Sequence, residues 1–294
     1  MAFQHTVRHP VSCSGVGLHS GVAVKLRILP AAADSGIVFR RTDLDGYEIE
    51  ATGRNVAKVS YATSLMKKGV LISTTEHMLS AFIGIGLDNA VIELDNLELP
   101  ILDGSAKPFV DMVMEAGLKE QRKKRMYMRV KKRVEVTEGV KQIAVEPSEG
   151  YSISYKIDFP EPIGASSYDV RLMGGTNGAN GDGSTTSNAY CREIAPARTF
   201  GFLRDEQNLR NMGLIRGASA ENAIIVDDAG VKNPPLRFPD EFVRHKVLDL
   251  IGDLALLGHR IQGRVVADRA GHAMHTALVS RLLRDRTLWE PVTL

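Results

Sequence analysis

Two segments, one in each half of the 294-residue chain, repeat the same pattern. EHMLSAFIG (76–84) and RHKVLDLIG (244–252) each place a histidine, His77 or His245, six residues before an Ile-Gly pair, and a strand pattern follows each of them. A recurrence of this length predicts a duplication, so the chain should fold into two similar units. If these units pack face to face about a pseudo-twofold axis, His77 and His245 can meet in the cleft between them.

The patterns on either side of residue 124 support this division. Alternating apolar and polar residues in GVAVKLRILP (21–30) and GIVFRR (36–41) predict strands of an antiparallel sheet. The basic stretch RKKRMYMRVKKR (122–133) then precedes a fresh run of strands. We therefore expect an N-terminal domain over residues 1–124 and a C-terminal domain over residues 125–294.

Composition argues against several classes of protein. The 37 Lys and Arg residues nearly balance the 35 Asp and Glu residues, so the net charge of +2 provides no global field for nucleic acid. No apolar run reaches the roughly 18 to 20 residues that span a bilayer, and the start MAFQHTVRHP lacks a signal-peptide apolar region. We expect a cytoplasmic protein, and Cys13 and Cys191, without a CxxC partner, fit a reducing compartment. The stretch at 122–133 could touch nucleic acid or anionic lipid, but such segments are more often solvated linkers.

The spacing of His245 and Asp249 suits metal binding. At 100° per residue the two side chains lie one turn apart on one face of a helix, away from its apolar face. With His77 they provide two imidazoles and one carboxylate, a three-ligand zinc set that leaves a fourth position open for water and hence for catalysis. HxxxD on a helix is more commonly an exposed ion pair, and the recurrent His77 is what favours the metal. A closed structural site would need a fourth ligand, and no cysteine or obvious histidine has suitable spacing.

Glu76 has two interpretations that its position leaves open. The segment STTE that ends at Glu76 matches the capping box S/T-x-x-E. A carboxylate beside a metal ligand is also where a general base would lie. His272 follows Gly271 at an expected strand-to-helix turn, where it could face a cleft or cap the helix. Four further histidines have no recurrent context and are expected at the surface: His5, His9, His259 and His275.

Five longer strings resemble one family when they are taken together. They are GVGLHSG (15–21), STTEHMLSA (73–81), ILDGSAKPFV (101–110), ARTFGF (197–202) and FVRHKVLDLIGD (242–253). With the Gly271-His272 turn, they resemble the UDP-3-O-acyl-N-acetylglucosamine deacetylase family of lipid A synthesis in Gram-negative bacteria over almost the whole chain. The resemblance implies an α+β fold of two similar domains, with helices sandwiched between two sheets and the active site at the domain junction.

The resemblance also implies an activity and a cofactor. The reaction would be zinc-dependent hydrolysis of the 2-acetamido group of UDP-3-O-(3-hydroxyacyl)-N-acetylglucosamine, which releases acetate and the free amine in the committed step of lipid A biosynthesis. His77, His245 and Asp249 would bind one zinc ion per chain, Glu76 would act as the base, and His272 would act as an acid or electrostatic stabiliser. A related zinc amidase on another acylated amino sugar is the alternative.

Further roles follow from the same matching. Asp253 would orient His272, and Thr199 would donate a hydrogen bond to the developing oxyanion. Lys246 would help to hold the sugar nucleotide, and Phe200 would lie beside its hexosamine and acyl region. We expect a monomer that binds this substrate and no nucleic acid, has no transmembrane segment and makes at most a transient contact with a membrane surface.

The segment from residue 174 to residue 226 allows two further predictions. Gly, Asn and Ser dominate residues 174–188, which predicts a mobile loop and departs from the expected family pattern. The pattern in residues 200–226 predicts strand, helix and strand with more apolar residues than one core-facing edge requires, which suggests an acyl passage. We expect its lining at Leu203, Ile215 and Ala220, with ordinary core packing as the alternative.

Overall fold

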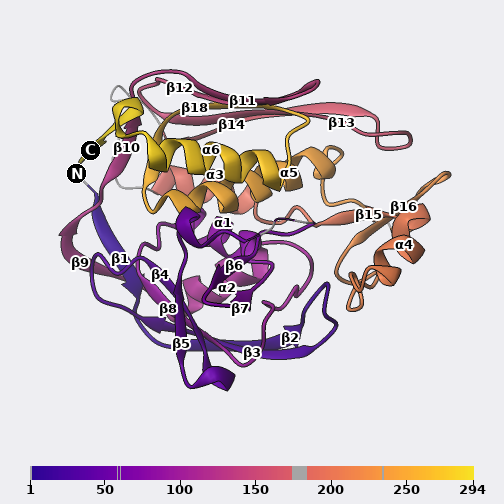
Figure 1. Ribbon diagram of the computed structural model, residues 1–294, viewed down its shortest axis with the longest axis horizontal. Coiled ribbons are helices and arrows are strands. Elements are labelled where there is room, and N and C mark those ends of the chain that lie inside the picture. Colours follow the sequence, from indigo (N-terminus) through magenta and orange to yellow (C-terminus); the bar gives the residue numbers. More distant parts are fainter. Residues whose placement is uncertain (1, 58, 60, 174–183, 234) are drawn as a thin grey trace.

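The structure is a computed structural model that describes residues 2–57, 59, 61–173, 184–233 and 235–294. Two large sheets form the outer layers, and the main helices lie between them (Figure 1). The expected α+β fold with sandwiched helices is therefore confirmed.

The first sheet contains five strands from the N-terminal half, in the order β2-β3-β8-β4-β5. Their bounds are β2 Val11–Val16, β3 Ala23–Pro30, β4 Ile37–Arg41, β5 Tyr47–Glu50 and β8 Ala90–Leu94. Alternate residues of β3, Val24, Leu26 and Ile28, are buried, as the alternating pattern predicted. The prediction of an antiparallel sheet is wrong for one pair, β4 and β8, which run parallel because the chain between them crosses over through a helix.

The second sheet contains seven strands from the C-terminal half. β18 lies at its centre and pairs with β12, β10 and β13, while β11, β19 and β14 pair with these in turn. The bounds are β10 Tyr127–Val130, β11 Val134–Glu138, β12 Lys141–Glu146, β13 Tyr151–Asp158, β14 Ala165–Met173, β18 Arg260–Asp268 and β19 Trp289–Val292.

Smaller elements complete the chain. Three small sheets contain β1 Phe3–Val7 with β9 Leu118–Lys124, β6 Leu65–Lys67 with β7 Val70–Ile72, and β15 Phe200–Phe202 with β16 Ile224–Asp227 and β17 Gly230–Val231. The α-helices are α1 Glu76–Ile85, α2 Lys107–Ala116, α3 Ser184–Glu193, α4 Glu206–Asn211, α5 Glu241–Leu254 and α6 His272–Arg284. Short 3-10 helices are η1 Thr42–Leu44, η2 Gly53–Asn55, η3 Leu203–Asp205, η4 Ala255–Leu257 and η5 Arg286–Leu288.

Helices α1 and α5 pack closely at the centre of the molecule (Figure 1). A Cβ atom added at Gly252 of α5 would lie 2.0 Å from the carbonyl oxygen of Glu76 at the start of α1, so this contact requires a glycine. Gly84, further along α1, makes room in the same way for the ring of Tyr190 from α3. Because α5 is packed on all sides, its polar residues His245 and Asp249 are buried as well as its apolar ones. The close approach brings residues 76 and 77 beside residues 245–253.

The same order of helix, strand and helix occurs in each half, as α1-β8-α2 and as α5-β18-α6. Both strands lie inside their large sheets and both first helices lie in the central layer (Figure 1). These facts agree with the duplication, which stays a prediction, as does the domain boundary near residue 124.

The structure also bears on the predictions for residues 122–133, 174–188 and 200–226. The basic stretch at 122–133 is not a linker, because it is largely made up of parts of β9 and β10. Residues 174–183 of the predicted loop lie outside the described residues, whereas residues 184–188 belong to α3 and are not a loop. The prediction of strand, helix and strand over 200–226 is confirmed by β15, α4 and β16. None of the described helices combines the length and apolar character that crossing a membrane requires.

Candidate metal centre and active site

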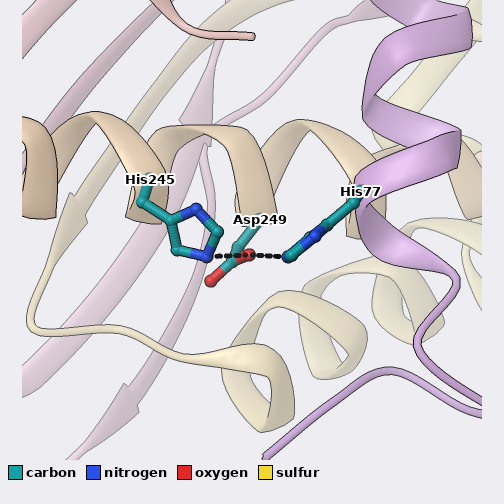
Figure 2. Close-up of side chains that lie close together, drawn as sticks. All are labelled: His77, His245 and Asp249. Atoms are coloured by element: carbon teal, nitrogen blue, oxygen red, sulfur yellow. Dashed lines mark ion pairs between the residues drawn. The ribbon is translucent and has the colours of Figure 1, made fainter. Parts of the chain in front are cut away.

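Three side chains that are distant in sequence converge between α1 and α5. His77 extends from α1, and His245 and Asp249 extend from successive turns of α5 toward it (Figure 2). Nε2 of His245 lies 3.3 Å from Oδ1 of Asp249, and Nε2 of His77 lies 3.6 Å from the same oxygen. All three residues are buried, and one ligand atom from each lies within 4.8 Å of the others. The structure thus brings together the three predicted metal ligands.

The protonation state of His245 determines which atom its ring presents to Asp249. Its Nδ1 lies 3.0 Å from the carbonyl oxygen of Ala197, which can only accept, so Nδ1 carries the proton. Burial lowers the pKa of His245 to about 4, and the neutral ring then directs the lone pair of Nε2 at Asp249. Oδ1 of Asp249 is itself buried and has no hydrogen-bond partner among the described residues. Acceptors that face one another in this way fit a cation, and two imidazoles with one carboxylate are a donor set that zinc prefers.

Asp249 is held ionised by its other neighbours. Burial alone would raise its pKa, but the positive charges of Lys246 and His272 outweigh burial and hold the pKa well below its usual range. Nζ of Lys246 donates to Oδ2 of Asp249, so the structure places Lys246 directly beside the candidate metal centre.

A second cluster surrounds Asp253, one turn further along α5. Nδ1 of His272 lies 2.7 Å and Nδ1 of His275 lies 2.8 Å from Oδ2 of Asp253. The hydroxyl of Thr63 donates to Oδ1 at 2.5 Å and lies 3.2 Å from Nδ1 of His272. Nε2 of His272 points the other way and lies 3.8 Å from Oδ2 of Asp249. The predicted pairing of Asp253 with His272 is therefore present in the geometry.

The charges of this cluster are coupled. Burial alone would lower the pKa of His272, but Asp253 and Asp249 outweigh it and raise the pKa to about 9. Burial would likewise raise the pKa of Asp253, but His272 and His275 lower it to about 2. His272 is therefore a cation at neutral pH and can donate a proton through Nε2.

The pKa of His272 gives the first prediction. In the metal-free protein, Asp253→Asn should lower this pKa by about 1 to 3 because the substitution removes the carboxylate that stabilises the imidazolium ion. NMR titration of the ring protons will measure the change. His259, which contacts Trp289 instead, should titrate alike in both proteins. An unchanged titration of His272 would show that Asp253 does not control its charge.

Glu76 does not form the predicted capping box. Oε2 of Glu76 accepts the backbone N–H of Thr63 at 3.1 Å, and no side chain caps the N-terminus of α1. The backbone N–H of Ser73, which the box would use, donates to the carbonyl of Leu97. Burial raises the pKa of Glu76, and the carboxylates of Asp253 and Asp249 add to this effect. A buried carboxylate with a raised pKa beside a metal centre is suited to accept a proton.

Comparison with known proteins identifies the family of this chain. A model of the LpxC family, UDP-3-O-acyl N-acetylglycosamine deacetylase, matches residues 4–284. The chain belongs to this family. Proteins named UDP-3-O-acyl-N-acetylglucosamine deacetylase are similar along their lengths: the one from Solibacter usitatus is 51% identical over 100% of this chain and 95% of its own. The one from Marinobacter nauticus is 44% identical over 100% of this chain and 94% of its own length. The one from Pseudomonas entomophila is 43% identical over 99% of this chain and 94% of its own length.

Two other residues that the family resemblance singled out lie near the metal centre. Thr199 follows the segment whose Ala197 carbonyl accepts from His245, and its backbone is held by Gly104 and Ile224. The ring of Phe200 lies 6.2 Å from that of His245 and packs edge to face on Phe242. The roles of both residues toward a substrate stay predictions.

The three residues predicted to line an acyl passage do not share one pocket. Leu203 is 43% exposed and lines a surface pocket. The other lining residues belong to β15, η3, β16 and the turn after β16: Phe202, Arg204, Val226, Asp227 and Asp228. Neither Ile215 nor Ala220 lines this pocket, and none of the three metal-site residues does. The passage therefore stays a prediction.

Several buried groups near the candidate site were not predicted from the sequence. His275 is fully buried, so its expected surface position is wrong; His5 and His259 are partly buried, and His9 is exposed. His275 follows His272 by three residues, and this helical spacing could have shown that the two rings share a face. Thr63 and the buried His19 gave no such signal, although His19 lies within the quoted string GVGLHSG.

Proposed function

We propose that this chain is a zinc-dependent deacetylase that hydrolyses the 2-acetamido group of a UDP-3-O-acyl-N-acetylglucosamine, releasing acetate and the free amine. The observation that carries the zinc assignment is the convergence of Nε2 of His77 and Nε2 of His245 on the buried Oδ1 of Asp249, which has no hydrogen-bond partner among the described residues. The substrate is the one in the names of the relatives, which match over the full length of the chain.

The residues around the centre divide the work of amide hydrolysis. When bound, zinc supplies a Lewis acid that polarises the amide carbonyl and makes water a better nucleophile. Glu76 accepts a proton from the attacking water, whose oxygen forms a bond to the carbonyl carbon. His272 is cationic and stabilises the developing oxyanion or protonates the departing amine as the C–N bond breaks, while Asp253 orients its ring. Thr199 adds a hydrogen bond to the oxyanion.

Lys246 and Phe200 are proposed to hold the substrate. The ammonium group of Lys246 faces the centre from α5 and can attract the anionic sugar nucleotide, and the ring of Phe200 offers an apolar surface beside His245. These contacts would place the acetamide next to Glu76 and His272.

The acyl passage at Leu203 leads to a second prediction. Leu203→Asp should raise KM for the acylated substrate roughly 10-fold or more, because a lost apolar contact costs about 1 to 3 kcal/mol, while metal content stays unchanged. Met212→Asp introduces the same charge at an exposed residue just after α4 and serves as the control. Equal kinetics for the two variants would exclude Leu203 from the passage.

The proposed function is tested by removing and restoring the metal. Protein stripped with a chelator should release no acetate from the UDP-linked 3-O-acyl sugar, and added zinc should restore acetate and amine in equal amounts. UDP-N-acetylglucosamine without the acyl chain is the control for substrate choice. Folded, zinc-loaded protein that releases no acetate from the acylated sugar would refute the proposal. Equal rates on the acylated sugar and on UDP-N-acetylglucosamine would indicate that the natural substrate is a different amino sugar, with or without an acyl chain.

A further inference from the structure

His275 has no part in the proposed chemistry, yet it is completely buried beside it. It lies on α6, one turn after His272, and its Nδ1 lies 2.8 Å from Oδ2 of Asp253. On the opposite side of the ring, Nε2 lies 3.1 Å from the hydroxyl of Tyr155 on β13. Both ring nitrogens therefore have a partner, and the partners come from different elements of the fold.

The hydrogen-bond roles along this chain of contacts can be assigned. Burial lowers the pKa of His275, so the ring is neutral and has one proton. The carboxylate of Asp253 can only accept, which places this proton on Nδ1. The lone pair of Nε2 then faces Tyr155, whose hydroxyl keeps its proton because burial raises its pKa. The hydroxyl of Tyr155 has one proton for two acceptors, Nε2 of His275 at 3.1 Å and the carbonyl oxygen of Ala270 at 2.7 Å.

These contacts constrain two groups that determine the placement of His272. Asp253 has donors on both oxygens: Thr63 on Oδ1, and the two imidazoles on Oδ2. Without His275, only Thr63 and His272 would hold the carboxylate, and Oδ2 would have one donor in place of two. Tyr155 holds the carbonyl of Ala270, two residues before His272, in the turn that connects β18 to α6. The backbone N–H of Arg269 in the same turn donates to the carbonyl of Lys156, adjacent to Tyr155.

We propose that His275 is a positioning residue of the reaction: it acts through Asp253 and, with Tyr155, fixes the direction in which Nε2 of His272 faces the substrate. The inference rests on the proposed role of His272. Residues that orient a catalytic imidazole from behind typically contribute 10- to 100-fold to activity, so His275→Leu should lower kcat by about that factor. KM and metal content should stay unchanged because the hydrogen bonds of His275 in the described part of the chain go to Asp253 and Tyr155, and not to a proposed metal ligand.

Two polar variants test the two hydrogen bonds of His275 one at a time, and neither places an apolar side chain among the buried polar groups. The amide nitrogen of Asn reaches the place of Nδ1, so His275→Asn keeps the donor to Asp253 and loses the contact with Tyr155. The amide oxygen of Gln reaches the place of Nε2 and can accept from Tyr155, so His275→Gln keeps the side that faces Tyr155 and loses the donor to Asp253. We expect kcat to fall in the order wild type, His275→Asn, His275→Gln. A merely structural role would instead make both variants lose thermal stability without this order in kcat.

A double-mutant cycle with His272→Ala completes the test, because groups that act through one another have non-additive effects. His275→Leu should lower kcat in the wild-type background and have no further effect when His272 is absent. The inference is overturned if the fold-loss is the same in both backgrounds, if His275→Leu has wild-type kcat, or if His275→Gln is as active as His275→Asn. Failure of the proposed function gives a different result, since wild-type protein would then be inactive or His272→Ala would be fully active.

Discussion

Replacing His245 with Ala is expected to prevent metal binding and to lower kcat/KM by roughly 10³-fold or more, since a metal Lewis acid contributes several kcal/mol to such reactions. Of the three proposed ligands, His245 has the best-defined protonation state. Its Nδ1 donates its proton to the carbonyl of Ala197, and its unprotonated Nε2 faces Oδ1 of Asp249. Without it, one imidazole and one carboxylate remain, which is too few protein ligands for a typical zinc site.

The measurement combines metal content with stability. Wild-type protein should retain one zinc ion per chain after dialysis, and its Tm should rise when zinc is added to the stripped protein, because a ligand that binds only the folded state stabilises it. His245→Ala should show neither effect and should still fold. His9→Ala changes an exposed histidine and is the matched control. A His245→Ala protein with one bound zinc and normal turnover would refute the ligand assignment.

The convergence of the three predicted metal ligands could be inferred from the sequence in part, because some of their arrangement is local. His245 and Asp249 are four residues apart, and helical geometry alone places them on one face of α5. His77 comes from another helix, and only the recurrent pattern in the two halves indicated that it would meet them. The sequence could not show how near the helices come, which depends on Gly252 and on the backbone of Glu76.

The groups around Asp253 could not be predicted in full because their contacts join distant parts of the chain. Thr63 lies 190 residues from Asp253, and nothing in its surroundings marks it as a partner of a carboxylate. Tyr155 belongs to a strand whose alternating pattern explains its burial as core packing. Periodicity predicts which side of an element is buried, but not which polar group meets it there.

The sequence alone could not assign a role to Glu76, because its carboxylate has more than one possible partner. The capping box and the general base both fit the sequence, since each requires only a carboxylate at the start of a helix. The structure favours neither a free carboxylate nor the box, because Glu76 accepts the N–H of Thr63 from a segment that precedes β6. Likewise, the parallel pairing of β4 with β8 depends on the route of the chain between them, which strand patterns do not reveal.

Replacing Glu76 with Gln is expected to give a folded protein that retains zinc but turns over roughly 10²- to 10⁴-fold more slowly, the usual contribution of a general base. Gln has nearly the same size and keeps an oxygen that can accept the N–H of Thr63, so the contact that Glu76 makes in the structure survives. What is lost is the ability to take a proton from water. A role confined to holding Thr63 predicts nearly normal turnover instead.

The pH dependence of the two proteins provides an independent test. A base must be ionised, so kcat/KM of the wild type should fall as the pH falls through the pKa of Glu76. Since burial raises that pKa, this acid limb should lie at higher pH than an ordinary carboxyl group would give, and it should be missing from the residual activity of Glu76→Gln. Glu93→Gln neutralises a carboxylate that pairs with Arg27 and Arg40 on the first sheet, and it should leave rate and pH profile unchanged. A zinc-loaded Glu76→Gln protein with the wild-type rate and acid limb would exclude Glu76 as the base, because Gln cannot accept a proton from water at these pH values.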